Sequence, residues 1–336
     1  MALHDNPDLA LPKGSLSLVT GASGYIASNV IFEALEAGYR VRGTARSASK
    51  KTTDAFKSSE YEHVVVTHID AEGAFDDAVR GVSAIIHVAS PTQWSSDPEE
   101  VVKPAVNSVK SIMTSAMGEP TVRSFVYTSS SVATTMAKPN QEFIIDKDLW
   151  NTDVDALVTE KADPGLVYSA SKVQAERAVW DFAKEHSPNF AVNTVVPNFN
   201  IGRIIGEKSN SSAILLDVFK GNSGFAFVTF PPQHMINVIE DARLHLIAAI
   251  DRTVVNERVL AFAYPCNWND ILDVFRELWP DKEFPSNNPA LGRDLSKVDN
   301  TLGIKLLRKW YGTESYTDLK ESIKQQFESV KIPYLT

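Results

Sequence analysis

A tyrosine, a lysine and a nearby run of hydroxyl side chains could together carry out acid–base chemistry on a carbonyl group. Tyr168 and Lys172 stand four residues apart, so they share one face if this stretch is helical. An ammonium beside a phenol favours the phenolate and lowers the pKa of the tyrosine, which suits proton transfer near neutral pH. The stretch Thr128–Ser131 (TSSS) adds hydroxyls that can donate to a carbonyl oxygen and stabilise negative charge on it.

Each of these signals is weak when it stands alone. The same Y-x-x-x-K spacing recurs at Tyr316 and Lys320, a pair that we assign to a solvated helix face. Serines after a strand are also common turn formers. Tyr168 is favoured because it follows a glycine turn and a serine run that ends a strand, where an α/β sheet binds its ligands.

The glycine turn lies in the stretch Thr20–Ser28 (TGASGYIAS), directly after an apolar strand. Gly21 allows the tight turn, Gly24 lets the backbone approach a pyrophosphate, and the small Ala27 permits close packing of helix and sheet. The amides that open the helix then face an anion. The expected cofactor contacts of this motif are Gly21, Ser23, Gly24, Tyr25 and Ile26. The same glycine spacing at 221–224 follows no strand and is interpreted as a surface loop.

The residues after the second strand indicate which dinucleotide is bound. An NAD site places an acidic residue about 20 residues after the glycines, whereas an NADP site offers arginine to the 2′-phosphate. No carboxylate occurs between positions 40 and 53, where Arg46 and Lys50 stand instead. We therefore expect NADPH, the alternative being a solvated basic start of a helix. Asp70, expected to end the third strand, is a candidate contact for the adenine or a plain turn or cap residue.

The elements that must position these residues alternate between strand and helix over the first 200 positions. Strands are expected at Ser15–Thr20, Tyr39–Ala45, His63–Ile69, Ala84–Val88, Ser124–Thr128 and Ala191–Val196, and helices at Ile26–Ala37, Glu99–Met117 and Ser169–Lys184. Such alternation predicts an α/β fold with a doubly wound parallel sheet of the Rossmann type. Later helices are expected at Glu240–Ile250, Asn269–Leu278 and Thr317–Val330, and Gly206–Ser212 is expected to be a loop.

This pattern predicts a dinucleotide-binding domain and a smaller C-terminal substrate cap. The Rossmann domain is expected over 12–200, with 236–263 rejoining it, and the cap over 201–235 and 264–336. Its 33 basic and 42 acidic residues give a net charge of −9, which argues against a nucleic-acid surface. The single cysteine, Cys266, excludes an internal disulfide, and no metal-ligand spacing is found. The sequence shows no membrane span or targeting signal, so we expect a cytoplasmic protein.

The motifs, taken together, resemble those of the extended short-chain dehydrogenases/reductases. They read TGASGYIAS, RGTARSASK, HVAS, FVYTSSS, YSASK and VVPNFNIG, spread over nearly the whole chain. Within that superfamily the sequence is similar to the dihydroflavonol-reductase-like group, and most of all to fungal NADPH-dependent aldehyde or carbonyl reductases, including the methylglyoxal-reductase type. The resemblance implies reduction of a small-molecule aldehyde or ketone to the alcohol by hydride transfer from NADPH, and leaves open a monomer or a homodimer.

The resemblance also implies roles for individual residues. Ser130 matches the catalytic serine, Tyr168 the acid/base, and Lys172 the residue that lowers the pKa of Tyr168 and holds the nicotinamide ribose. Pro197 would approach the carboxamide. Residues 87–90, which include Ala89 and Ser90, would flank the nicotinamide ribose and the diphosphate. The residues expected to face the nicotinamide from the substrate side are Trp94, Phe199, Phe230 and Gln233.

The aromatic pocket residues suit an apolar or aryl carbonyl compound, although each is equally compatible with plain core. Two departures from the patterns of related families argue against a dihydroflavonol substrate and against nucleotide-sugar chemistry. Plant flavonoid reductases carry an asparagine where this chain reads Val132–Thr135, and sugar epimerases carry one at the position of Ala105. The alternatives to a carbonyl reductase are a non-catalytic NADP-sensing regulator and a nucleotide-sugar epimerase or dehydratase.

Overall fold

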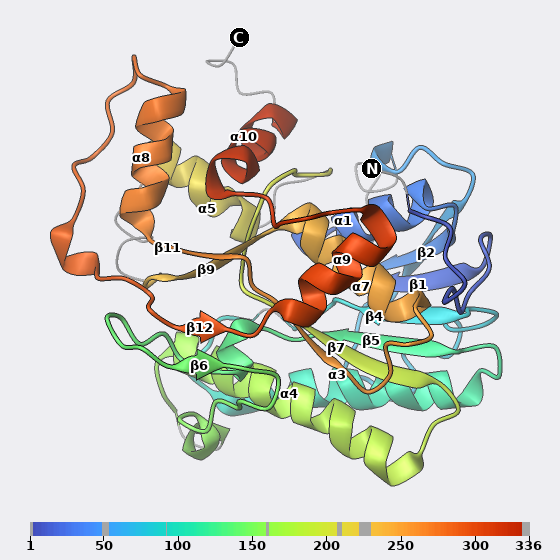
Figure 1. The fold of residues 1–336 in the computed structure, drawn as a ribbon. Helices are drawn as coiled ribbons and strands as arrows, with labels where there is room; N and C mark the ends of the chain where they lie inside the picture. The colour runs from blue at the N-terminus through green and yellow to red at the C-terminus, as the bar shows by residue number, and fades with distance from the viewer. Residues whose placement is uncertain are drawn as a thin grey trace.

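The computed structural model describes residues 3–48, 54–91, 93–158, 161–206, 210–221 and 230–330. A parallel sheet of seven strands runs through its centre in the order β10-β7-β5-β4-β1-β2-β3 (Figure 1). The strands of this sheet are β1 (Leu16–Thr20), β2 (Arg40–Ala45), β3 (Tyr61–Val65), β4 (Ala84–His87), β5 (Ser124–Thr128), β7 (Ala191–Pro197) and β10 (Arg258–Ala261). The predicted doubly wound α/β fold is therefore confirmed.

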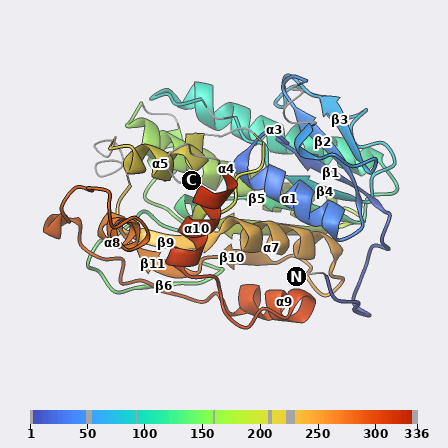
Figure 2. The ribbon, with the colours of Figure 1, turned by 90° about the horizontal axis from the view of Figure 1, so that it is seen from above.

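Helices cover both faces of the sheet, as Figures 1 and 2 show. One face carries α3 (Pro98–Gly118) and α4 (Pro164–His186), and the other carries α1 (Tyr25–Glu36), α7 (Val238–Ile250) and α9 (Thr301–Tyr311). All five residues of β1 are buried, as expected for a strand covered on both sides. An aspartate caps α3 and another caps α4, each followed by a proline at the first helical position.

The C-terminal half adds a small second layer beside the carboxyl ends of the central strands. Its elements are β8 (Phe199–Ile201), α5 (Asn210–Phe219), β9 (Gln233–Asn237), β11 (Tyr264–Cys266), α8 (Trp268–Leu278), η3 (Pro289–Leu291) and α10 (Leu319–Ser329). The strands β8, β9 and β11 form a three-stranded sheet. The remaining short elements are η1 (Ser131–Ala133), η2 (Asp155–Val158) and the paired strands β6 (Ile144–Ile145) and β12 (Lys297–Val298).

Several expected boundaries are wrong. The third strand ends at Val65 because the chain enters a turn closed by a hydrogen bond from the Ala71 amide to the His68 carbonyl. The expected loop at Gly206–Ser212 runs into α5, which begins at Asn210. The helix α9 was not predicted. Its buried face, which includes Leu306, Leu307 and Trp310, gives it an amphipathic pattern typical of a surface helix.

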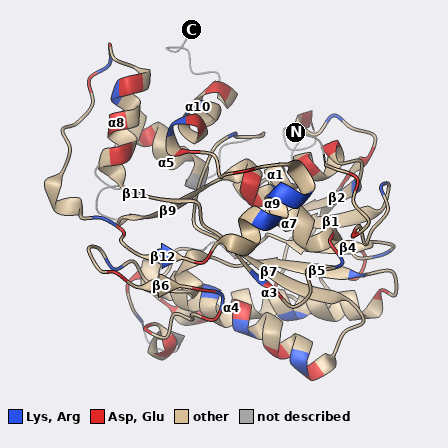
Figure 3. Cartoon of the chain, in the orientation of Figure 1, with Lys and Arg blue, Asp and Glu red and all other residues tan. Residues whose placement is uncertain are grey.

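Charged residues are intermixed on the outer helices. Figure 3 shows acidic and basic positions side by side along α4 and α8. Within the described ranges, none of the helices combines the length and the apolar character that a membrane crossing requires. Nor do the His, Cys, Asp and Glu side chains of these ranges form a group of three or more that could hold a metal ion.

Candidate active site

The turn after β1 and the start of α1 form a cradle of main-chain atoms. Gly21 has a φ of +78°, a conformation that favours glycine. A Cβ on Gly21 would lie 3.2 Å from the Cα of Ala89, and a Cβ on Gly24 would lie 3.1 Å from the carbonyl oxygen of Gly21. The Ala89 amide donates to the Thr20 hydroxyl at 3.0 Å, which fixes the loop after β4 against this turn. The cradle therefore lies between β1 and β4, where the strand order reverses and such sheets bind dinucleotides.

The first turn of α1 lacks a side-chain cap. Its N-cap residue is Gly24, so no side chain of the N-cap accepts a hydrogen bond from the first amides of the helix. The first amides of a helix have no intrahelical partner and attract anions. Small residues at the turn and uncapped amides above it fit the pyrophosphate of a dinucleotide.

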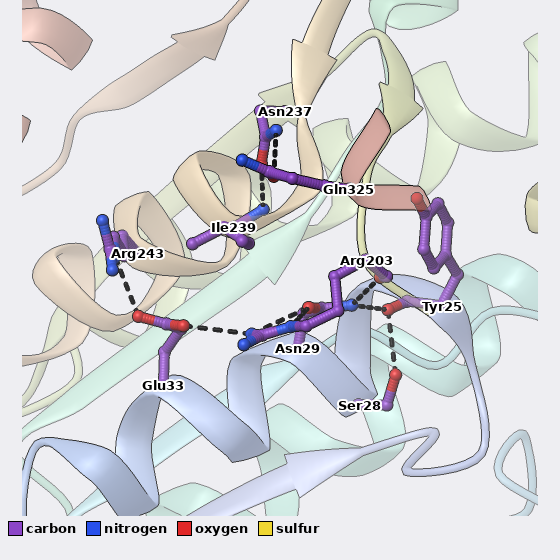
Figure 4. Close-up of polar contacts among 9 residues, drawn as sticks. All are labelled: Tyr25, Ser28, Asn29, Glu33, Arg203, Asn237, Ile239, Arg243 and Gln325. Atoms are coloured by element: carbon purple, nitrogen blue, oxygen red, sulfur yellow. Dashed lines mark hydrogen bonds and ion pairs between the residues drawn. The ribbon is translucent and has the colours of Figure 1, made fainter. Parts of the chain in front are cut away.

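The side chain of Tyr25 does not face this cradle, contrary to the expected contact with the cofactor. Its phenol is buried and donates to the carbonyl oxygen of Gly202 at 2.7 Å (Figure 4). Asn29, one turn later, donates to the carbonyl oxygen of Arg203 at 3.1 Å. A contact from Tyr25 to the cofactor is thus restricted to its main chain, because the ring packs toward the C-terminal half.

Ion pairs continue this connection along α1. The Glu33 carboxylate is 3.1 Å from Arg203 and 2.8 Å from Arg243 of α7 (Figure 4). Burial lowers the pKa of Arg203, and the charge of Glu33 acts in the opposite direction. The helix that opens at the dinucleotide cradle is therefore fixed to the segment that follows β8.

The residues expected to select NADPH lie at the carboxyl end of β2. Arg46 directly follows this strand and is exposed, so its guanidinium is free to meet a phosphate in solution. Lys50 lies outside the described residues. Asp70 is exposed in a turn, five positions after the end of β3, so its expected place at the end of the strand is wrong.

The three candidate catalytic side chains meet at the carboxyl end of β5. Lys172 is 4 % exposed, and its Nζ donates to the carbonyl oxygen of Thr128 at 3.0 Å. The same Nζ lies 5.2 Å from the centre of the Tyr127 ring. The side chain of Ser130 acts on the phenol of Tyr168 and lowers its pKa. Strand β5 and helix α4 thus bring together the serine, the tyrosine and the lysine that the sequence singled out.

The pKa values in this cluster differ from the expectation. Burial raises the pKa of Tyr168 above its ordinary value of 10.0, and the side chain of Ser130 only partly opposes this shift. Burial is thus the largest influence on the pKa of this phenol. Burial also lowers the pKa of Lys172 to about 8, and the charge of Glu176 acts against this lowering.

His87 connects the cradle to this cluster. Its Nδ1 is 2.9 Å from the Thr20 hydroxyl and its Nε2 is 3.2 Å from the Ser108 hydroxyl. Burial, assisted by the charge of Lys172, lowers the pKa of His87 to about 3. The imidazole is therefore neutral near pH 7 and links β1, β4 and α3 by hydrogen bonds.

Aromatic rings lie near the same edge of the sheet. Trp94 is 61 % exposed, and its ring centre is 6.4 Å from that of Tyr168. Phe199 and Phe230 stack at 6.0 Å, and both contact Trp268, which donates from Nε1 to the Phe230 carbonyl oxygen at 3.2 Å. The structure thus gathers two of the expected pocket residues into one aromatic cluster.

Gln233, the remaining expected pocket residue, and Pro197, the expected neighbour of the carboxamide, both lie on strands. Gln233 begins β9 and pairs with Cys266 of β11. Pro197 ends β7, is buried and pairs with Ala261 of β10.

Comparison with known proteins agrees with this geometry. Residues 17–216 match the model of the NAD dependent epimerase/dehydratase family. The chain belongs to this family. It is 38% identical over 338 residues to aldehyde reductase 2 of Sporidiobolus salmonicolor, covering 96% of this chain and 98% of that one. It is 34% identical to the ketoreductase adrE of Penicillium rubens, covering 94% and 96%.

A solved structure of the family superimposes over most of the chain. It is yeast methylglyoxal/isovaleraldehyde reductase Gre2 complexed with NADPH, with a TM-score of 0.80 and 26% sequence identity. The superposition covers 94% of this chain and 97% of that one. The predicted membership of the extended short-chain dehydrogenases/reductases is confirmed.

Two side chains at the site were not predicted from the sequence. Trp268 packs against both pocket phenylalanines and has no local motif that would reveal it. Glu176 lies one helical turn beyond Lys172, a spacing that was available as a signal.

The second Y-x-x-x-K pair lies elsewhere. Tyr316 is buried, with its hydroxyl 3.4 Å from the Asn300 carbonyl oxygen, so the expected solvated helix face is wrong for it. Lys320 is exposed and forms an ion pair with Glu277.

Proposed function

We propose that this chain reduces an aldehyde or ketone to the alcohol with NADPH. The observation that carries the proposal is the meeting of Ser130, Tyr168 and Lys172 at the end of β5, in a sheet whose β1/β4 crevice fits a dinucleotide. Relatives that match nearly the whole chain are named aldehyde reductase and ketoreductase, and the yeast reductase that superimposes on it was solved with NADPH.

The chain's own residues bind the carbonyl oxygen and deliver the proton. NADPH, when bound, supplies the hydride that adds to the carbonyl carbon. The hydroxyls of Ser130 and Tyr168 donate to the oxygen, where negative charge develops. Because burial raises the pKa of Tyr168, the phenol is protonated at neutral pH and passes its proton to that oxygen. The Lys172 ammonium then stabilises the phenolate left on Tyr168, and would also hold the nicotinamide ribose.

Local basic residues support the preference for NADPH. Arg46 and Lys50 would hold the 2′-phosphate, because no carboxylate stands between positions 40 and 53. The remaining residues proposed to contact the cofactor are Gly21, Ser23, Gly24, the main chain of Tyr25, Ile26, Asp70, Ala89, Ser90 and Pro197.

We further propose that the substrate is an apolar or aryl carbonyl compound. Trp94 lies against Tyr168, and Phe199 and Phe230 form a stacked wall supported by Trp268. Gln233 would provide the polar contact of this pocket. Aromatic linings of this kind favour ligands with apolar surface.

The domain division is part of the proposal. Segment 236–263 would belong to the dinucleotide-binding domain of 12–200, since β10 pairs with β7 in the central sheet. The cap would comprise 201–235 and 264–336. We propose a cytoplasmic enzyme that acts as a monomer or a homodimer.

The test is consumption of NADPH, followed by its near-ultraviolet absorbance, with a panel of aliphatic aldehydes and aryl ketones. We expect steady oxidation with at least one aryl or branched carbonyl compound, and a chiral alcohol as the product of a ketone. Binding of NADPH without turnover of any compound would favour a sensing regulator. Interconversion of nucleotide sugars without net loss of NADPH would favour an epimerase or dehydratase.

A further inference from the structure

A buried carboxylate lies one helical turn beyond the candidate catalytic lysine. Glu176 of α4 is fully buried and is bound from three elements. Its Oε1 accepts from the Thr194 hydroxyl at 2.8 Å and from Nε of Arg258 at 2.8 Å. Its Oε2 accepts from the Ser129 hydroxyl at 2.5 Å and from Nη2 of Arg258 at 3.1 Å. Burial of an ion pair is costly unless its hydrogen bonds are satisfied, and these are.

The partner Arg258 reaches this position from the edge strand β10. It is 6 % exposed, and its guanidinium lies 4.2 Å from the centre of the Trp150 ring. It also donates to the carbonyl oxygens of Leu149 at 2.5 Å and Ala133 at 3.4 Å. One arginine therefore connects β10 and α4 with the segment that follows Ser130.

These contacts hold the chain on both sides of Ser130. On one side, the Ser129 hydroxyl is bound to Glu176, and its amide donates to the Val195 carbonyl oxygen at 2.8 Å. On the other side, the carbonyl oxygen of Ala133 accepts from Arg258 and from the Asn151 amide at 3.0 Å. The chain that carries Ser130 is thus held on both sides by contacts from β7, β10 and α4.

The same carboxylate acts on Lys172. The titratable groups around that ammonium are Tyr168 and Glu176 on α4, Tyr127 on β5 and His87 on β4. Among these, Glu176 supplies the negative charge, since His87 is neutral and both phenols are protonated near pH 7. The carboxylate therefore favours the charged form of Lys172 against the effect of burial.

We propose that Glu176 and Arg258 are positioning residues of the reductase, which direct the Ser130 hydroxyl and keep Lys172 in its ammonium form. This inference rests on the proposed reductase function. It assigns to one buried ion pair two effects on the reaction, neither of which involves contact with the carbonyl compound. A pair that served stability alone would change the free energy of unfolding and leave the pH profile of turnover in place.

The test uses the full-length enzyme with NADPH and the best carbonyl substrate found above. We expect kcat to decrease at alkaline pH as Lys172 loses its proton. In Glu176→Gln this decrease should occur about one pH unit lower, because the negative charge that favours the Lys172 ammonium is lost. In Ser129→Ala, which keeps the ion pair, we expect kcat to fall about tenfold at an unchanged affinity for NADPH. Thr194→Val is the matched control, since it removes a hydrogen bond from the opposite oxygen of the same carboxylate, and we expect its kcat to stay within about twofold of wild type.

A Glu176→Gln enzyme with the wild-type pH profile would overturn the proposal. So would equal losses of kcat in Ser129→Ala and Thr194→Val, and this comparison decides the matter if Glu176→Gln does not fold. Failure of the proposed reductase function would give a different result. The wild-type enzyme would then bind NADPH, but none of the carbonyl compounds tested would lead to its oxidation.

Discussion

The Nζ of Lys172 lies 3.0 Å from the main-chain oxygen of Thr128, the last residue of β5. The lysine is therefore anchored to the strand whose end carries the serines, and its charge stays beside the site when Tyr168 gives up a proton. The phenol keeps a pKa above 10.0, which suits a proton donor in the direction of reduction.

Replacement of the proton donor is the most direct test of this arrangement. We expect Tyr168→Phe to lower kcat by about 10²- to 10⁴-fold, because the hydroxyl that protonates the carbonyl oxygen is lost. Fluorescence titration should give an unchanged dissociation constant for NADPH. Tyr316→Phe, from the other Y-x-x-x-K pair, should retain wild-type turnover. Normal activity in Tyr168→Phe would remove Tyr168 from the mechanism.

The glycine cradle predicts a selective loss of cofactor binding. We expect Gly21→Ala to weaken NADPH binding by about tenfold or more, since its Cβ would meet Ala89 at 3.2 Å beside the helix that faces the pyrophosphate. Gly81→Ala is a matched control, because Gly81 has a similar φ of +71° and no atom within 4 Å of the added Cβ. Both variants carry backbone strain, so equal affinities for NADPH in the two would contradict the role of the cradle.

Cofactor choice should depend on Arg46. We expect Arg46→Ala to lower kcat/KM for NADPH by about tenfold and to leave the value for NADH nearly unchanged, because a charged contact to the 2′-phosphate is lost. Steady-state kinetics with both cofactors measure the ratio. Arg40→Ala, at the opposite end of β2, should leave that ratio unaltered. A loss of equal size with NADPH and NADH would argue against a phosphate contact.

The free energy of unfolding should decrease as the pH rises, because a buried glutamate of α7 then loses its proton. Burial raises the pKa of Glu240 from 4.5 to about 7, so the folded chain binds its proton more tightly than the unfolded chain. Its Oε1 accepts from the Thr317 amide and hydroxyl, whereas its Oε2 has no hydrogen-bond partner among the described residues. The stabilisation is complete below the unfolded pKa and is lost as the pH rises through about 7, and it amounts to up to about 3 kcal/mol.

Glu240→Gln should remove this dependence. Urea unfolding of both proteins at about pH 5 and about pH 8 gives a double difference in the free energy of unfolding, in which other titrating groups cancel. We expect the variant to gain stability relative to wild type as the pH rises. An unchanged difference between the two proteins across this range would show that Glu240 titrates normally.

Much of the site was accessible from the sequence because its chemistry lies at strand ends. The alternation of strand and helix places Gly21, Ser130 and Pro197 at the carboxyl ends of β1, β5 and β7, and the structure has them there. The prediction that Asp70 ends the third strand was wrong, because no local residue pattern marks the end of β3 before the turn.

Tertiary contacts account for what the sequence did not reveal. The pKa of Tyr168 depends on burial by segments distant in the chain, and no spacing rule measures that burial. The ring of Tyr25 follows the glycine motif, yet it packs onto Gly202, a contact between residues far apart in sequence. Arg258 joins Glu176 only because β10 is the neighbour of β7 in the sheet.

The place of Arg258 in the chain has a consequence for biosynthesis. A ribosome releases Ser130, Tyr168, Lys172 and Glu176 well before it has made β10. Until that edge strand docks beside β7, the carboxylate of Glu176 has no guanidinium partner, and a buried unpaired charge opposes closure of the surrounding core. Docking of the last strand of the sheet is therefore the step that gives the buried Glu176 its guanidinium partner.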